Sequence, residues 1–173
     1  MQFKSDGTLK IMQITDMQEI PAISPDTLAL LDAAVEAEHP DLVIYTGDQI
    51  KGYGVTYKGK TKKELEAAVA KTITALLEPV TRRHIPFAVT FGNHDRQVGL
   101  DNRAQFEIYK EIPGFIGEDT PGVDGVGNCV LEIADGDRPG YLLYLIDSHS
   151  SLKVGYDHVH QNQIDWYRGV RDS

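Results

Sequence analysis

The stretch LVIYTGD, residues 42–48, is a run of apolar side chains that stops abruptly at a glycine and an aspartate. A continuous apolar run of this length is typical of a β-strand that is covered on both faces, as in a parallel sheet. The pattern recurs on either side of it. Residues 9–15 form a β-prone run that ends at Asp16, and residues 86–91 lead into Gly92-Asn93-His94-Asp95. Three predicted strands therefore end in polar side chains that can bind or react.

The segments between these strands have the pattern of amphipathic helices. Ser24 can cap a helix that begins at Pro25 and stops before Pro40, and Thr61 with Glu64 forms a capping box for a second helix. Alternating strands and helices predict βαβ units with parallel strands and right-handed crossovers. Because ligands bind at the carboxyl ends of such strands, we expect the three polar clusters to converge at one edge of the sheet.

The second half of the chain predicts a different arrangement. A short helix over residues 102–112 is followed by two predicted strands, 129–134 and 141–146, which a turn-rich segment over 135–140 joins into an antiparallel hairpin. Residues 161–171 have a helical pattern. The expected fold class is α/β: a βαβαβ parallel sheet with flanking helices plus a β-hairpin.

The composition excludes several classes of partner. The net charge of −9 argues against wrapping nucleic acid, because neutralising phosphates needs a basic stripe. No apolar run approaches the roughly 20 residues of a membrane span, and the N-terminus lacks a signal-peptide pattern. We therefore expect no membrane partner and a cytoplasmic location for the chain as given, or an extracellular one if a leader has been removed. The single cysteine, Cys129, lies in an apolar stretch and is interpreted as a buried, inert thiol.

The polar residues after the strands have side chains suited to metal chemistry. A carboxylate such as Asp48 can bridge two cations with its two oxygens, and Asp16 offers a second hard ligand. Asn93 adds an amide oxygen, while His94 can donate a proton near neutral pH. The set combines metal ligands with a possible acid.

At these residues the sequence resembles the calcineurin-like metallophosphoesterase superfamily, whose ordered signature is Asp-x-His, then Gly-Asp, then Gly-Asn-His-Asp/Glu. The counterparts here are Asp16-Met17-Gln18, Gly47-Asp48 and Gly92-Asn93-His94-Asp95. The later segments 147–157 and 163–166 look like the purple-acid-phosphatase-like bacterial branch. The resemblance implies that residues 1–173 form a single, incomplete domain, the N-terminal part of the family's two-sheet sandwich.

The resemblance also implies a function and a role for each residue of the site. The function is that of a metal-dependent phosphoesterase that hydrolyses phosphate mono- or diesters through a binuclear centre of two divalent ions, Mn, Zn, Fe or Mg. By analogy with the family, Asp16 binds the first metal, Asp48 bridges the two metals and Asn93 binds the second metal. Gln18 stands where the family has a histidine ligand. His94 stabilises or protonates the leaving oxygen, and Asp95 orients His94. An amide at Gln18 favours a harder ion than Zn²⁺ at that position.

Two later histidine motifs that close the family's metal site are not recognisable in this sequence. His149, after the predicted strand 141–146, and the pair His158 and His160 are candidate substitutes, although the favoured interpretation of each is an ordinary loop residue. The alternative function is therefore a truncated, non-catalytic metal-binding or interaction module of the same fold. A shortened sheet would also leave edge strands open, which makes a homo-oligomer an expected partner state.

Overall fold

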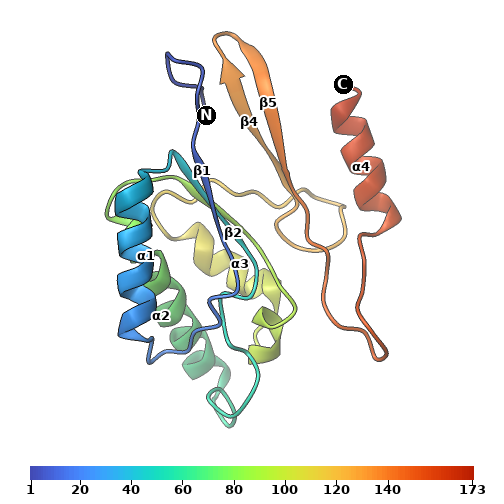
Figure 1. The fold of residues 1–173 in the computed structure, drawn as a ribbon. Coiled ribbons are helices and arrows are strands. Elements are labelled where there is room, and N and C mark those ends of the chain that lie inside the picture. The colour runs from blue at the N-terminus through green and yellow to red at the C-terminus, as the bar shows by residue number, and fades with distance from the viewer.

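The computed structural model describes all 173 residues. Figure 1 shows the order and arrangement of its elements. In chain order these are β1 (Ile11–Ile14), α1 (Pro25–Glu38), β2 (Leu42–Thr46), α2 (Lys62–Thr81), β3 (Phe87–Thr90), the 3₁₀ helix η1 (Asp95–Val98), α3 (Asn102–Lys110), β4 (Cys129–Asp135), β5 (Arg138–Leu145) and α4 (Gln161–Arg171).

The first three strands form one parallel sheet in the order β1-β2-β3. Val43 of β2 lies opposite Met12 on one side and Phe87 on the other, so the carboxyl ends of all three strands finish together. The remaining strands, β4 and β5, form an antiparallel hairpin. The predicted α/β class, with a βαβαβ parallel sheet, flanking helices and a hairpin, is confirmed.

The central strand β2 separates two layers of core. Val43 and Tyr45 pack into a cluster of 17 buried residues with α1, α2 and α3. Leu42 and Ile44 point to the opposite face, where they pack against Leu131 and other buried residues of the hairpin. This alternation follows from the two-residue period of a strand. Helices therefore cover one face of the sheet and the hairpin covers the other (Figure 1).

The helix ends follow the sequence prediction closely. Ser24 caps α1 with Pro25 in its first turn, and Thr61 and Glu64 form the predicted capping box at the start of α2. The short helix η1, which begins directly after His94, was not predicted, because a single 3₁₀ turn has no apolar periodicity to reveal it.

The hairpin turn is tighter than the sequence suggested. Asp135 pairs with Arg138, so the loop between β4 and β5 contains two residues instead of the predicted segment 135–140. Gly136 has φ +61°, a conformation that suits a two-residue hairpin loop. Pro139 lies within β5 beside an irregularity in the strand register, where a proline is tolerated.

The two ends of the chain lie against the hairpin side of the molecule (Figure 1). Near the N-terminus, Phe3 N–H donates to the carbonyl oxygen of Ala134 at 3.0 Å, which extends β4 at its edge. At the other end, the rings of Trp166 and Tyr167 in α4 contact Tyr144 of β5. None of the helices combines the length and the apolar composition needed to cross a membrane.

Candidate functional site

The three strand ends meet at Asp48. Asp16 N–H donates to the carbonyl oxygen of Gly47 at 3.1 Å, and Gln18 N–H donates to the carbonyl oxygen of Asp48 at 2.8 Å. From the other side, the backbone N–H of His94 donates to Oδ1 of Asp48 at 2.8 Å. The segments that follow β1, β2 and β3 are thus joined by hydrogen bonds at one edge of the sheet.

Glycines allow this close approach. A Cβ on Gly47 would lie 2.5 Å from the backbone nitrogen of Gly92, and a Cβ on Gly92 would lie 2.1 Å from Oδ1 of Asp48. Gly47 also has φ +102°, a conformation that favours glycine. The two glycines next to the polar residues therefore let the ends of β2 and β3 touch.

The backbone is strained where the polar side chains leave the strands. Asp16, Gln18 and Asp48 have φ values of +56°, +47° and +55°. A non-glycine residue in this left-handed region costs on the order of 1 kcal/mol or more, and such residues cluster at functional sites. Two successive strands thus use the same unusual conformation to present their acidic residue.

Asp48 and Asp16 differ in how their carboxylates are held. Asp48 is buried, its Oδ1 is fixed by His94, and its Oδ2 accepts no hydrogen bond from the protein. Asp16 is exposed, and one of its oxygens accepts from the hydroxyl of Thr15 at 2.7 Å. Each carboxylate therefore keeps lone pairs for a cation, which is a fit between these residues and the predicted metal ligands.

Gln18 is engaged by a neighbouring tyrosine. The hydroxyl of Tyr53 donates to Oε1 of Gln18 at 2.8 Å. An amide oxygen has two lone pairs, so one remains for another partner. The ring of Tyr53 also packs on the ring of His94, with 4.8 Å between their centroids. Tyr53 thus links the first and third polar clusters.

Asp95 holds the backbone of the site. Its carboxylate accepts from the N–H groups of Asp48, Ile50 and Gly92 at 2.8, 2.9 and 2.8 Å. Burial raises the pKa of Asp95 to about 6, while these three donors favour its charged form. Its oxygens are directed to these backbone donors, and no hydrogen bond joins Asp95 to the ring of His94, which it is expected to orient.

Gln97 contacts the His94 ring instead. Oε1 of Gln97 lies 2.9 Å from Nδ1 of His94, and because an amide oxygen can only accept, Nδ1 donates. This tautomer leaves Nε2 of His94 without a proton of its own to donate unless the ring is charged. Sequence reasoning missed Gln97, although its position three residues after His94, on the next turn of η1, was a usable signal.

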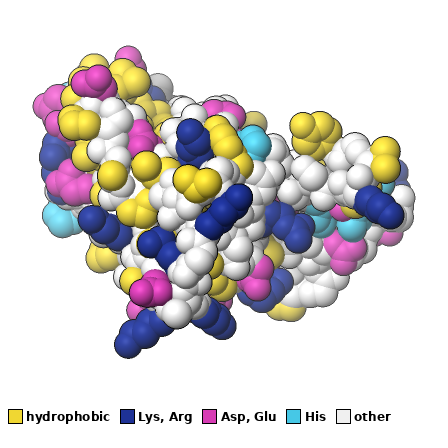
Figure 2. Space-filling view, turned by 90° about the horizontal axis from the view of Figure 1, so that it is seen from below, with side chains coloured by type: hydrophobic (Ala, Val, Ile, Leu, Met, Phe, Trp, Pro, Cys, Tyr) yellow, Lys and Arg dark blue, Asp and Glu magenta, His cyan; other side chains and the backbone are white.

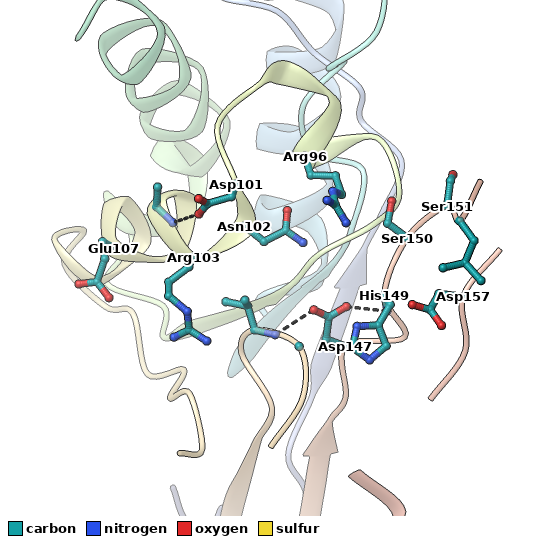
Figure 3. A pocket seen from close by; sticks show the side chains of 14 residues that line it. Arg96, Asp101, Asn102, Arg103, Glu107, Asp147, His149, Ser150, Ser151 and Asp157 are labelled. Carbon is teal, nitrogen blue, oxygen red and sulfur yellow. Dashed lines mark hydrogen bonds between the residues drawn. The ribbon is translucent and has the colours of Figure 1, made fainter. Parts of the chain in front are cut away.

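A cavity of about 630 Å³ lies beside this edge of the sheet. Figure 3 shows Arg96, Asp147, His149 and Ser150 among the side chains that line it. The hydroxyl of Ser150 donates to the carbonyl oxygen of Asn93 at 3.3 Å, so the cavity adjoins the third polar cluster. Figure 2, seen from the end where the parallel strands finish, shows Lys and Arg mixed with Asp, Glu and His on this face.

The three candidate substitute histidines, His149, His158 and His160, have different environments in the structure. His158 is exposed, with 81% of its side chain accessible, and its ring lies edge-on to that of His160 with 5.6 Å between centroids. His160 is the N-cap residue of α4, and its ring stacks on that of His149 with 4.0 Å between centroids. His149, Asp157 and His160 form a group of possible metal ligands that does not include Asp16 or Asp48.

Comparison with known proteins places this site in a family. A model of the calcineurin-like phosphoesterases matches residues 9–171. An uncharacterized protein of Schizosaccharomyces pombe is 29% identical over 92% of this chain and 32% of its own length. A protein of Arabidopsis thaliana named probable inactive purple acid phosphatase 14 is 26% identical over 96% of this chain and 47% of its own length. Phosphatase DCR2 of Saccharomyces cerevisiae is 27% identical over 99% and 33%.

This chain thus spans about a third to a half of the length of these relatives. The matched family region contains all three strand-end motifs, from Asp16 to Asp95. Because the family model matches nearly the whole sequence, from residue 9 to residue 171, the chain belongs to the calcineurin-like phosphoesterase family.

Proposed function

We propose that this chain forms the catalytic region of a metal-dependent phosphoesterase that hydrolyses phosphate mono- or diesters. The observation that supports it most is the convergence at Asp48, where the residues after three separate strands are joined by hydrogen bonds to its backbone and its carboxylate. Turn formation alone does not require three polar clusters at one edge of a sheet. Membership of the family makes phosphate-ester hydrolysis the natural chemistry for such a cluster.

Asp16, Asp48 and Asn93 are the proposed ligands of two divalent ions, with Gln18 as a further oxygen donor. Their donor set consists of carboxylate and amide oxygens, which suits Mn²⁺ or Mg²⁺. When bound, such ions supply a nucleophile at neutral pH and neutralise charge on the phosphoryl group. Asp48 is the proposed bridge. This role is supported by its hydrogen bonds to residues after both neighbouring strands and by an Oδ2 that has no protein donor.

His94 is the proposed acid. Its Nδ1–H is held by Gln97, which fixes the ring and leaves Nε2 as the position where a proton is taken up and given to the leaving oxygen. Tyr53 packs against the same ring, 4.8 Å away, and limits its rotation. Asp95 contributes indirectly, since its carboxylate ties together the backbones of Asp48, Ile50 and Gly92.

Hydrolysis of chromogenic phosphomonoesters and phosphodiesters, with Mn²⁺, Zn²⁺, Mg²⁺ or a chelator added, tests the proposal. We expect turnover that needs a metal and falls by a factor of at least about 100 in Asp48→Asn and in His94→Asn, because a bridging ligand or an acid is lost. Asp137→Asn, in the hairpin loop, is the matched control and keeps the parent rate. Metal-dependent turnover that persists in Asp48→Asn would contradict the assignment.

One observation favours a second candidate, a non-catalytic metal-binding module of the same fold. Gln18 stands where the family resemblance expects a histidine, and its amide oxygen is already engaged by Tyr53. In this case the chain binds Mn²⁺ but releases no product from either ester. The same assay distinguishes the two functions when metal binding is measured on the same samples.

A further inference from the structure

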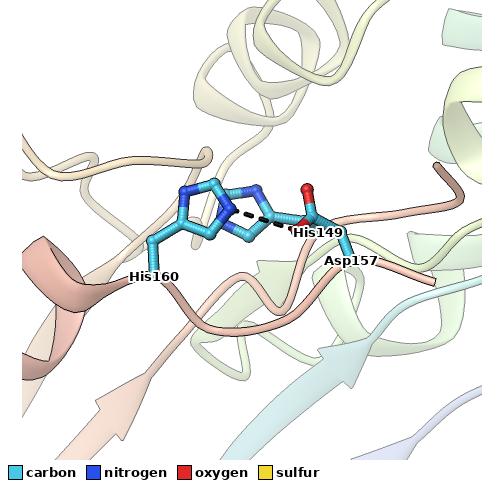
Figure 4. A group of neighbouring side chains, drawn as sticks. All are labelled: His149, Asp157 and His160. Carbon is cyan, nitrogen blue, oxygen red and sulfur yellow. Dashed lines mark hydrogen bonds and ion pairs between the residues drawn. The ribbon is translucent and has the colours of Figure 1, made fainter.

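A second group of metal-ligand side chains lies outside the three strand-end clusters. His149 follows β5, Asp157 lies in the loop after it, and His160 caps α4 (Figure 4). One ligand atom from each of the three lies within 4.8 Å of the others. We propose that His149, Asp157 and His160 bind one divalent cation of the zinc type, at a site distinct from that of Asp48.

Each of the two rings gives one nitrogen to a hydrogen-bond acceptor, as histidine ligands of metals do. Nδ1 of His160 lies 2.8 Å from Oδ2 of Asp124, and Nε2 of His149 lies 3.0 Å from Oε1 of Gln163. Since these oxygens only accept, both nitrogens donate, which leaves Nδ1 of His149 and Nε2 of His160 for a cation. A histidine ligand characteristically gives its other N–H to a carboxylate or carbonyl in this way.

The amide of Gln163 is fixed so that its oxygen faces His149. Its nitrogen donates to the carbonyl oxygen of Asp147 at 2.7 Å and to Oδ1 of Asn128 at 2.9 Å. Its oxygen also accepts from the backbone N–H of His160 at 2.7 Å. Gln163 is fully buried, and this network fixes Nε2 of His149 as a hydrogen-bond donor.

Asp157 supplies the third ligand. Its Oδ1 lies 3.2 Å from Nε2 of His160 and accepts from the backbone N–H of His158 at 2.9 Å. A bound cation would lie between these two atoms, where it would replace the proton that Nε2 carries in the charged form of His160. The two rings are stacked with 23° between their planes and would turn apart to share an ion, which the part-exposed side chain of His160 allows.

A structural role for His160 alone does not explain the group. Capping of α4 and the ion pair with Asp124 need only His160. They do not require His149 to stack on it from a left-handed backbone conformation, φ +68°, which is costly for a histidine. They also leave unexplained the hydrogen bond between Nε2 of His149 and the buried Gln163, and a cation shared by the two rings would account for both features.

The ligand set selects the class of cation. Two imidazole nitrogens and one carboxylate oxygen suit Zn²⁺ or Co²⁺, whereas Mg²⁺ and Ca²⁺ prefer oxygen ligands throughout. His149 and Asp157 also line the cavity of about 630 Å³ described above, which gives an ion a path to the site. The bound ion would tie the loop after β5 to the start of α4.

Binding of Co²⁺ and Zn²⁺ to the Asp48→Asn chain tests this site apart from the strand-end residues. We expect that chain to bind one Co²⁺ with visible absorption bands of nitrogen ligation. A second substitution in that chain, His149→Asn or His160→Asn, should weaken Co²⁺ binding at least about tenfold. Asp124→Ala should also weaken it, because Nδ1 of His160 then loses its acceptor. His84→Asn is the matched control, because His84 is exposed and also has a positive φ, +55°.

Histidine ¹⁵N spectra of the Asp48→Asn chain test the site without mutating its proposed ligands, so that unfolding caused by a ligand substitution cannot affect the result. Zn²⁺ should shift Nδ1 of His149 and Nε2 of His160, while the other nitrogen of each ring stays protonated. Absence of these shifts would overturn the proposal. So would Co²⁺ affinity that is unchanged in His149→Asn and His160→Asn, or a failure of the Asp48→Asn chain to bind any Co²⁺ or Zn²⁺.

Discussion

At the residue scale, the site depends on how closely main chain approaches Asp48. Its carboxylate accepts from His94, its N–H donates to Asp95, and its carbonyl accepts from Gln18. A larger residue at position 92 would disturb the first two of these contacts, because its Cβ would meet Oδ1 and the backbone nitrogen of Asp48. Backbone geometry thus matters here as much as the choice of ligands.

Gly92→Ala tests this close approach. The added Cβ lies 2.1 Å from Oδ1 and 2.6 Å from the backbone nitrogen of Asp48, so the strand ends must move apart. We expect a loss of about 1–3 kcal/mol in the free energy of unfolding, together with weaker Mn²⁺ binding. Urea denaturation and metal titration measure the two effects.

Gly169→Ala provides the control for that substitution. A Cβ on Gly169 meets no atom within 4 Å, and alanine is the better helix former in α4. Unfolding of Gly92→Ala at the same urea concentration as the parent would show that the close approach is unimportant.

Sequence alone identified the positions of the polar clusters but not every partner of their side chains. Asp16, Asp48 and Asn93 follow strands that apolar runs reveal, so their common edge was predictable. The role of Asp95 was not, because whether a buried carboxylate turns to a ring or to backbone donors depends on the path of η1. Tyr53 likewise reaches the site from a loop, whereas Gln97 does so from η1, three residues after His94, a spacing that sequence reasoning did not use.

At the element scale, the helix boundaries follow from local chemistry, whereas their mutual packing adds ion pairs that no periodicity predicts. Asp32 of α1 contacts Arg82 and Arg83, which lie at the end of α2, and Arg83 also pairs with Glu36 at 2.6 Å. The hydrogen bond from Arg83, then that from Arg82, holds the pKa of Asp32 below its usual 3.8. These pairs join the two helices that cover the sheet.

Asp32→Asn should therefore destabilise the chain in a pH-dependent way. A lowered carboxyl pKa contributes stability that is present above the unfolded value of 3.8 and is lost as the pH falls through the folded value. We expect the variant to melt below the parent at about pH 7, with the difference shrinking below about pH 4 and in high salt. Thermal unfolding over a pH series measures it.

A difference in melting temperature between Asp32→Asn and the parent that stays constant from neutral to acid pH would contradict this interpretation of the ion pairs. Glu66→Gln is a suitable control, since Glu66 is paired only with Lys62 on the exposed surface of α2 at 3.7 Å. Such surface pairs contribute little to stability.

At the scale of the whole molecule, the position of the site follows from the two layers, helices on one side and the hairpin on the other, that cover the parallel sheet. The helices and the hairpin cover opposite faces of β1-β2-β3, and the segments that follow the strands meet at the carboxyl end of the sheet (Figure 1). This layering was predictable from strand and helix patterns. The stacking of His149 on His160 was not, because it depends on how α4 and the loop after β5 return to the body of the molecule.

The central claim is that the residues after β1, β2 and β3 hold divalent cations. Titration of the chain with Mn²⁺, followed by the electron paramagnetic resonance signal of the free ion, tests it most directly. The His149→Asn background restricts the measurement to the strand-end residues. The account predicts binding of about two Mn²⁺ per chain, which Asp48→Asn weakens at least about tenfold while Asp137→Asn has no effect. Equal Mn²⁺ binding with and without the Asp48 carboxylate would contradict it.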